Sequence, residues 1–200
     1  TELISLTAFY KLIKNPISRI EVASAGGYLS YENIADKATV AGVEVEVRKN
    51  LFVRPLSSAA NGMNKLSFGL NGSYIYTNAK MPLATVTTGS QLEGAAPWIA
   101  NFDLSHNFTK GNHSFINTLV LNYVSDKIYT IGTQGYQDIM EQGMMTLDFV
   151  SQAKLNKYVS LTLKARNLLN PSYKLSRKAN ESGEKVVLSD YKKGINISLG

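Results

Sequence analysis

Residues 159–173 read VSLTLKARNLLNPSY, and the way this stretch begins and ends decides the fold. From Val159 to Ala165, apolar side chains alternate with polar or charged ones, so one face of the segment is apolar and the other is polar. Residues 167–170 then break the alternation ahead of Pro171, which has no N–H to donate to a paired strand. The stretch therefore predicts an amphipathic β-strand that ends before the proline.

The same period of two residues recurs along the whole chain. Between residues 39 and 49, for example, valines alternate almost perfectly with glycine, glutamate and arginine. The predicted strands span about residues 3–12 with a continuation at 17–22 beyond Pro16, then 39–49, 66–77, 97–108, 114–130, 145–154, 159–165 and 191–199. No helical period competes with this pattern, so the sequence predicts an all-β protein with about eight long strands.

The connections between the predicted strands alternate in length. Residues 109–113 and 156–158 are short turns, whereas the longer loops cover residues 22–38, 79–94, 131–143 and 177–185. Short turns at one end and long loops at the other are typical of outer-membrane barrels. The connection at 52–63 is expected to break the alternation, because it is longer than the other turns.

The composition of the two strand faces favours a membrane. The polar face holds mostly Ser, Thr, Asn and Gly, as expected for a wet and crowded lumen, and aromatic residues fall near the strand ends, where interfacial girdles lie. Strands of about ten residues or more are also long for a soluble β-sandwich. We therefore predict a segment of an antiparallel, up-and-down transmembrane β-barrel.

Composition excludes several other classes of protein. The 21 Lys and Arg residues exceed the 15 acidic residues, giving a formal net charge of +6, but they are scattered and form no basic stripe, so we expect no nucleic-acid partner. The chain has no cysteine, which excludes a disulfide scaffold and a thiolate metal site. No apolar run approaches the ~20 residues that a membrane-spanning helix needs.

Five segments resemble a known family. ARNLLNPSY at residues 165–173 resembles the penultimate-strand motif of TonB-dependent outer-membrane receptors, which has the form V-x-N-L-L-N/D-x-x-Y. Four more segments are similar to the Bacteroidetes branch of that family: GVEVEVRKNL (42–51), LEGAAPWIANFDLSHNF (92–108), YQDIMEQGMMTLDFVSQAKL (136–155) and YKKGINISLG (191–200). Each motif is short, but the five occur in the family's order and spacing and cover nearly all of the chain.

The resemblance implies a barrel of about 22 strands with an N-terminal plug domain in its lumen. Residues 1–200 would form the C-terminal part of that barrel, without the plug, the TonB box or the earlier strands. The implied function is active uptake of a nutrient or metal chelate across the bacterial outer membrane with TonB-coupled energy. The implied partners are outer-membrane lipid, the receptor's own plug domain, the TonB complex through that plug and, in some systems, a surface lipoprotein.

The residues themselves indicate no catalytic, cofactor-binding or metal site, so we expect the chain not to be an enzyme. His106 falls on an apolar face and His113 in a short turn, and neither has an acidic neighbour that would orient it. The charged side chains predicted to face the lumen are Glu44, Glu46, Arg48, Asp103, Asp148, Lys164 and Arg166. The loop side chains predicted to contact substrate in the extracellular space are Tyr28, Tyr31, Glu32, Tyr136 and Asp138.

Two other interpretations are open on sequence alone. A small, self-closed eight-stranded barrel with a structural or adhesion role would require the strand that begins at Leu3 to pair with the strand that ends at Gly200. A soluble β-sandwich binding module would instead bury its apolar faces between two sheets.

Overall fold

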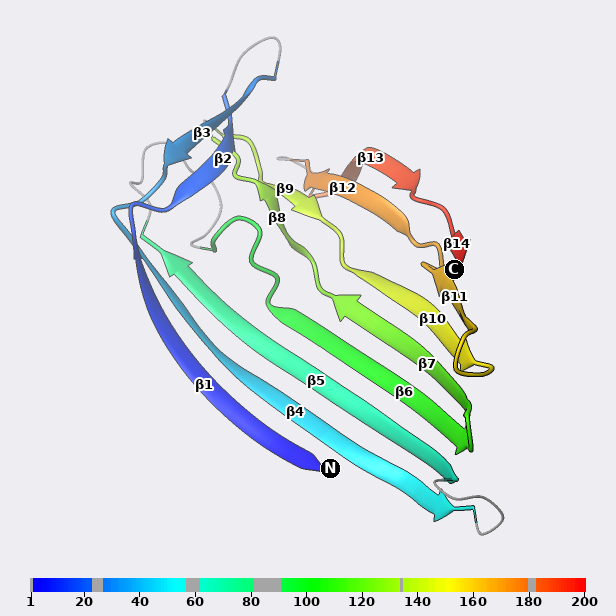
Figure 1. The fold of residues 1–200 in the computed structure, drawn as a ribbon. Coiled ribbons are helices and arrows are strands. Elements are labelled where there is room, and N and C mark those ends of the chain that lie inside the picture. The colour runs from blue at the N-terminus through cyan, green and yellow to red at the C-terminus, as the bar shows by residue number, and fades with distance from the viewer. Residues whose placement is uncertain (1, 23–26, 57–61, 81–90, 134, 180–182) are drawn as a thin grey trace.

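The computed structural model describes residues 2–22, 27–56, 62–80, 91–133, 135–179 and 183–200, and every regular element in these ranges is a β-strand (Figure 1). The described residues contain no helix that is long and apolar enough to cross a membrane. The strands are β1 (Leu3–Lys14), β2 (Ile17–Glu21), β3 (Leu29–Asn33), β4 (Lys37–Pro55), β5 (Met63–Ala79), β6 (Trp98–Lys110), β7 (His113–Val124), β8 (Lys127–Thr130), β9 (Ile139–Glu141), β10 (Met144–Lys154), β11 (Ser160–Arg166), β12 (Ser172–Lys178), β13 (Lys185–Lys192) and β14 (Asn196–Leu199).

Eight of these strands form one main sheet in the order β1-β4-β5-β6-β7-β10-β11-β14, in which every neighbouring pair is antiparallel. This order follows the chain, so the predicted all-β, up-and-down architecture is confirmed. Strands β1 and β14 lie at opposite sides of the sheet and do not pair with each other among the described residues (Figure 1). The sheet is therefore open, and the self-closed eight-stranded barrel is not formed.

Six shorter strands extend the main sheet beyond one of its ends, which we call the outer end. The four-stranded sheet β13-β12-β9-β8 repeats the order of β14, β11, β10 and β7, and the pair β2–β3 repeats that of β1 and β4 (Figure 1). The sequence prediction was wrong to leave β3 and β9 in loops and to omit β12. These segments are only three to seven residues long, too short to establish a period. Strand β3 pairs with β2, whereas β9 and β12 pair with each other and with β8 and β13.

Two predicted strands are interrupted where they leave the main sheet. The predicted strand 114–130 divides at Ser125 and Asp126, because the Ser125 hydroxyl accepts a hydrogen bond from the Trp98 N–H at 3.0 Å and Asp126 accepts one from the Gly143 N–H at 2.6 Å. The predicted strand 191–199 is likewise interrupted, between β13 and β14, and β13 begins at Lys185, before the predicted start. Side chains that hydrogen-bond to the backbone in this way replace the backbone hydrogen bonds between strands and let the chain change direction.

The opposite end of the main sheet, the inner end, carries only short connections. Strands β6 and β7 are joined by residues 111–112, and β10 and β11 by residues 155–159. The prediction that residues 52–63 break the alternation was wrong, because β4 and β5 extend to Pro55 and from Met63 and leave only residues 56–62 between them. Of these, residues 57–61 lie outside the described part of the chain.

The NLLN stretch, residues 167–170, forms the hinge between β11 and β12. Asn167 and Asn170 have positive φ values of 59° and 44°, a backbone conformation that asparagine tolerates better than most residues. The Asn167 side chain donates to the Gly194 carbonyl at 2.7 Å, and the Gly194 N–H donates to the Asn170 side chain at 3.0 Å. Because the Asn167 N–H also donates to Asp148 at 2.8 Å, the hinge ties three strands together where they leave the main sheet.

The two faces of the main sheet differ in both chemistry and exposure. On β7, the apolar-face side chains Phe115, Leu119 and Tyr123 are exposed, whereas residues of the polar face between them are only partly exposed. The apolar face continues over the other strands, and Leu6 on β1 is 74% exposed. An apolar surface that spans eight strands without a covering layer is what a lipid-facing barrel wall presents.

The hinge generates a prediction about stability. Asn167→Val should reduce the free energy of unfolding by about 1–3 kcal/mol, because a β-branched residue is strained at positive φ. Asn167→Gly should cost less, about 0.5–1.5 kcal/mol, because glycine keeps the backbone conformation and loses only the side-chain hydrogen bond. Urea unfolding of the full-length protein in lipid vesicles measures both changes, and a glycine variant less stable than the valine variant would contradict the account of the hinge.

Candidate functional site

The polar face of the main sheet is built as rows of side chains that lie beside one another on neighbouring strands. The row through Glu46 continues as Asn71, Asn101, Asn122 and Thr146. The Asn101 amide donates to Asn71, and the Asn122 amide donates to Thr146, each at 3.4 Å. Such a ladder of amides and hydroxyls presents donors and acceptors to water or to a polar ligand.

A second row on the same face carries most of the charges that the sequence placed there. It runs through Arg48, Gly69, Asp103, Val120 and Asp148. The Asp103 carboxylate lies over Gly69, so closely that a Cβ built on this glycine would come within 2.3 Å of it. The absence of a side chain at Gly69 therefore creates the space that the carboxylate occupies.

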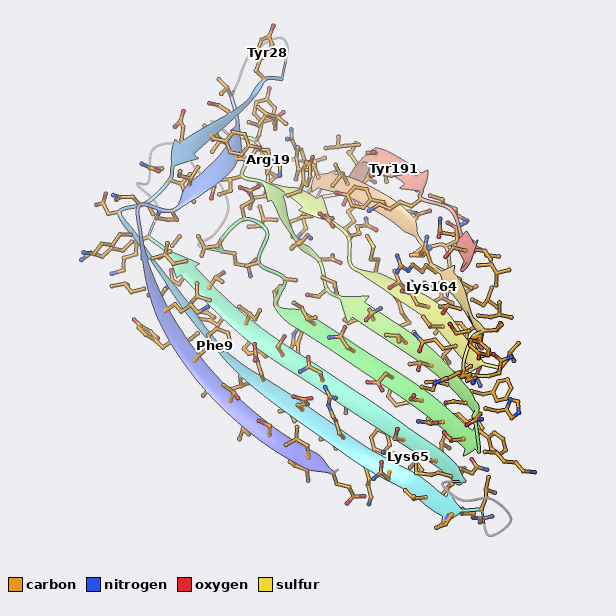
Figure 2. The ribbon with its side chains drawn as sticks, viewed as in Figure 1. Phe9, Arg19, Tyr28, Lys65, Lys164 and Tyr191 are labelled. Atoms are coloured by element: carbon orange, nitrogen blue, oxygen red, sulfur yellow. The ribbon has the colours of Figure 1, made fainter. Side chains whose placement is uncertain are left out.

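The remaining predicted lumen-facing residues share this face. Arg166 follows Ala165, the partner of Phe149, and so continues the charged row beside Asp148, while Lys164 lies opposite Val150 and Ser198 (Figure 2). Glu44 is exposed in the row of Ser73 and Thr7. All seven predicted side chains thus lie on one face of the sheet, and that this face lines the lumen stays a prediction.

Only one direct ion pair forms among these seven residues. Arg48 Nε lies 2.6 Å from Glu46 Oε1, and both side chains are well exposed, so the pair contributes little to stability. Asp148 is engaged by the N–H of Asn167 in the hinge. The charged row is therefore a surface of spaced charges rather than a closed network.

A depression of about 390 Å³ lies where the polar face meets the hinge. Its lining includes Asp148, Arg166, Tyr173 and Lys193, so it offers both signs of charge and a phenol. Tyr173 packs against Tyr191 with ring centroids 5.0 Å apart and the rings tilted by 41° (Tyr191 is labelled in Figure 2). Burial, together with the nearby Glu141 carboxylate, raises the pKa of Tyr173 to about 12.

Most buried apolar residues of the described chain gather at the outer end, either in the short strands and connections or at the ends of β4 and β5. Ile20, Ile34, Ile128 and Ile131 form one cluster and join β2, β8 and the segment before β4. A second cluster packs Leu92 onto Ala38 and Ala79, and the Leu92 N–H donates to the Thr77 hydroxyl at 3.0 Å. Residues next to the longest connections are thus anchored against the strands.

A charged network fixes these outer segments to one another. Arg19 on β2 contacts the Glu93 carboxylate with its guanidinium at 3.0 Å and with its own N–H at 2.5 Å, and its guanidinium lies 4.0 Å from the Tyr129 ring centre (Arg19 is labelled in Figure 2). Burial, the largest single effect, lowers the pKa of Arg19, but the hydrogen bond to Glu93 and the charges of Tyr129, Glu93 and Tyr31 together outweigh it and leave the pKa raised. The guanidinium therefore remains charged and links three segments.

Glu21 extends the network to the other side of the outer end. Its carboxylate pairs with Arg177 on β12, and its carbonyl accepts a hydrogen bond from the Thr133 hydroxyl. Arg177 in turn lies 5.3 Å from the ring centre of Tyr136. The backbone of Ile131 also exchanges hydrogen bonds with β2, since its N–H donates to Arg19 and its carbonyl accepts from Glu21.

The predicted substrate contacts in the loops fall into two groups. Tyr28 and Tyr31 are 70% and 68% exposed at the β2–β3 hairpin, where Glu32 is also exposed (Figure 2 labels Tyr28). Tyr136 is exposed beside Arg177, whereas Asp138 is only 9% exposed and accepts a hydrogen bond from the Gly132 N–H at 2.8 Å. The hairpin residues are thus accessible to a ligand, whereas the Asp138 side chain stabilises its own loop through the bond to Gly132.

The network around Arg19 was missed from the sequence. Arg19 and Glu93 are 74 positions apart, and Glu21 and Arg177 are 156 positions apart. No local spacing marks such pairs, and all four residue types are common on ordinary protein surfaces. Among the described residues, no group of three or more His, Cys, Asp or Glu side chains is arranged to hold a metal ion.

Residues 1–168 match the family described as TonB dependent receptor-like, beta-barrel. No curated protein and no solved structure matches the chain.

The network generates a prediction about local stability. Arg19→Gln should weaken the outer-end contacts by about 1.5–3 kcal/mol, because it removes a charge-assisted hydrogen bond and leaves the partly buried Glu93 without its cation. Hydrogen exchange of the full-length protein should speed up at Gly94 and Ile131, whose amides bond across these segments. Arg48→Gln, which removes an exposed ion pair, serves as the control, and equal effects of the two variants would contradict the account of the network.

Proposed function

This chain belongs to the TonB-dependent receptor β-barrel family, whose members are bacterial outer-membrane proteins. We propose that it forms the C-terminal part of the barrel wall of an active transporter. The single observation that carries this proposal is the open eight-stranded sheet with an exposed apolar face and a polar face of aligned amides, hydroxyls and charges. An open sheet needs further strands at both edges, and the resemblance of residues 165–173 to the penultimate-strand motif supports a position of this segment near the end of the barrel.

The chemistry of the two faces indicates which side of the sheet would contact lipid and which would line the lumen. The apolar face would contact lipid, where every backbone polar group must find a partner within the protein. The unpaired N–H and C=O groups along β1 and β14 would then be satisfied by the neighbouring strands of the complete barrel. The polar face would line the lumen and contact the plug domain.

The distribution of polar groups supports a path for the substrate through the barrel. Substrate would first meet the exposed hairpin residues Tyr28, Tyr31 and Glu32, and the ladder of amides and charges would then offer weak and exchangeable hydrogen bonds along the lumen. Energy for uptake would reach the receptor through the plug and the TonB complex. The substrate would be a nutrient or a metal chelate, since aromatic rings and amides suit sugars, peptides and chelates alike.

Catalysis is not part of this proposal. His106 lies on the apolar face with its Nε2 2.8 Å from the Asn64 side chain, and His113 lies at the inner end. Neither position has a nucleophile and an acidic residue arranged around the imidazole in the described chain, as acyl transfer would require.

The transport proposal is tested in the full-length receptor. Strains that lack the gene or carry it are compared for growth on defined siderophores, vitamins, glycans and peptides, and uptake of the identified substrate is then measured. The combined substitution Tyr28→Ala, Tyr31→Ala and Glu32→Gln should weaken substrate binding roughly tenfold or more, because aromatic side chains supply much of the contact energy at binding surfaces. Uptake should also stop when a protonophore removes the proton-motive force.

Tyr158→Ala is the matched control, because Tyr158 is 82% exposed but lies in an inner-end turn. This variant should bind and take up substrate like the wild type. Unchanged uptake in the hairpin variant would refute the assignment of the hairpin to substrate capture. Uptake that persists with the protonophore would refute the energy coupling.

A further inference from the structure

Three lysines lie side by side on the lipid-facing side of the main sheet, at its outer end. Lys14 on β1 is the direct antiparallel partner of Lys37 on β4. The register between β4 and β5 runs to Ala38 opposite Ala79, so the next position brings Lys80 beside Lys37. All three lysines are exposed, and they continue the face that carries Leu12 and Tyr10.

These lysines have no acidic partner within the described residues. The ion pairs of the described chain use other residues, and none includes Lys14, Lys37 or Lys80. Like charges directly opposite each other in a sheet repel and are destabilising. A row of three unpaired cations is therefore complementary to an anion that carries more than one negative charge.

An aromatic belt lies directly below the lysines. Tyr10 and Tyr76 flank Ala41 on the same face, and Tyr74 packs against Trp98 one row further down, with ring centroids 4.6 Å apart. Tyrosine and tryptophan with this exposure mark the level of the lipid headgroups. The lysines lie on the outer side of these rings, within reach of the phosphates of the outer leaflet.

An apolar groove of about 390 Å³ begins at the inner edge of this belt, at Tyr74 and Trp98. It is lined by Val43, Val45, Tyr74, Trp98 and Ala100 together with Gly72, Ser73, Ile99 and Tyr123. Its floor is open at Gly72, because a Cβ built there would meet no atom within 4 Å. The groove suits an acyl chain that descends from a headgroup held at the lysines.

We propose that Lys14, Lys37 and Lys80 form a binding site for the phosphate groups of an outer-leaflet lipid whose acyl chain lies in the groove at Gly72. The inference rests on the outer-membrane family of the chain and not on which substrate the receptor carries. The occupant is a phosphate-bearing lipid rather than a free anion, because the cations and the apolar groove lie on the same face.

The test uses the full-length receptor, purified and delipidated in detergent, with fluorescent bisphosphorylated lipid A as the probe. The combined substitution Lys14→Gln, Lys37→Gln and Lys80→Gln should weaken lipid A binding by about tenfold or more, because each lysine near the membrane surface attracts anionic lipid. Binding to the wild type should fall as salt is raised, since exposed charges are screened. Lipid A without phosphates should bind the wild type as weakly as bisphosphorylated lipid A binds the triple variant.

The control variant Lys110→Gln, Lys154→Gln and Lys157→Gln removes the same charge from the inner end. It should bind lipid A like the wild type, and retained substrate binding by both variants shows that they are folded. Equal loss in the two triple variants would overturn the proposal in favour of a general charge effect. Displacement of lipid A by inorganic phosphate as effectively as by unlabelled lipid A would overturn it in favour of a free-anion site.

Discussion

The structure depends on the requirement that backbone polar groups remain hydrogen-bonded inside a lipid bilayer, where water cannot satisfy them. Long antiparallel strands meet this requirement along the main sheet, and the period of two then sends alternate side chains to opposite faces. The apolar face carries Leu6, Phe102 and Leu119 toward lipid, while Asn71, Asn101 and Asn122 occupy the other face. Beyond the outer end of the main sheet this requirement no longer applies, so the chain can form hinges, short strands and a buried core.

The outer end is therefore organised by side-chain chemistry rather than by the ladder alone. Asn167 and Asn170 hold a strained turn by bonding to the Gly194 backbone, and Arg19 joins β2 to Glu93 and to Tyr129. These contacts give the exposed β2–β3 hairpin a fixed base. A rigid base with exposed aromatic side chains is a suitable arrangement for ligand capture, because less conformational entropy is lost on binding.

The main sheet could be predicted from the sequence, because alternation from Val43 to Val47 or from Trp98 to Leu104 specifies both a strand and its faces. The hinge was only half predicted: Pro171 marked a strand end, but the positive φ of Asn167 and its bond to Gly194 depend on a residue 27 positions away. Strands β3, β9 and β12 were missed because segments of three to seven residues are too short to establish a period. The Arg19–Glu93 contact had no sequence signal, since only the folded outer end brings these two residues together.

The most direct test of the central claim is the environment of consecutive side chains on β4 in the full-length receptor. Spin labels are placed singly at positions 43 to 47, and electron paramagnetic resonance measures collisions with oxygen, which is enriched in lipid, and with a water-soluble nickel complex. The account predicts that labels at Val43, Val45 and Val47 respond mainly to oxygen and that labels at Glu44 and Glu46 respond mainly to nickel. Nickel accessibility at all five positions, or the reverse alternation, would show that this face of the sheet does not contact the membrane.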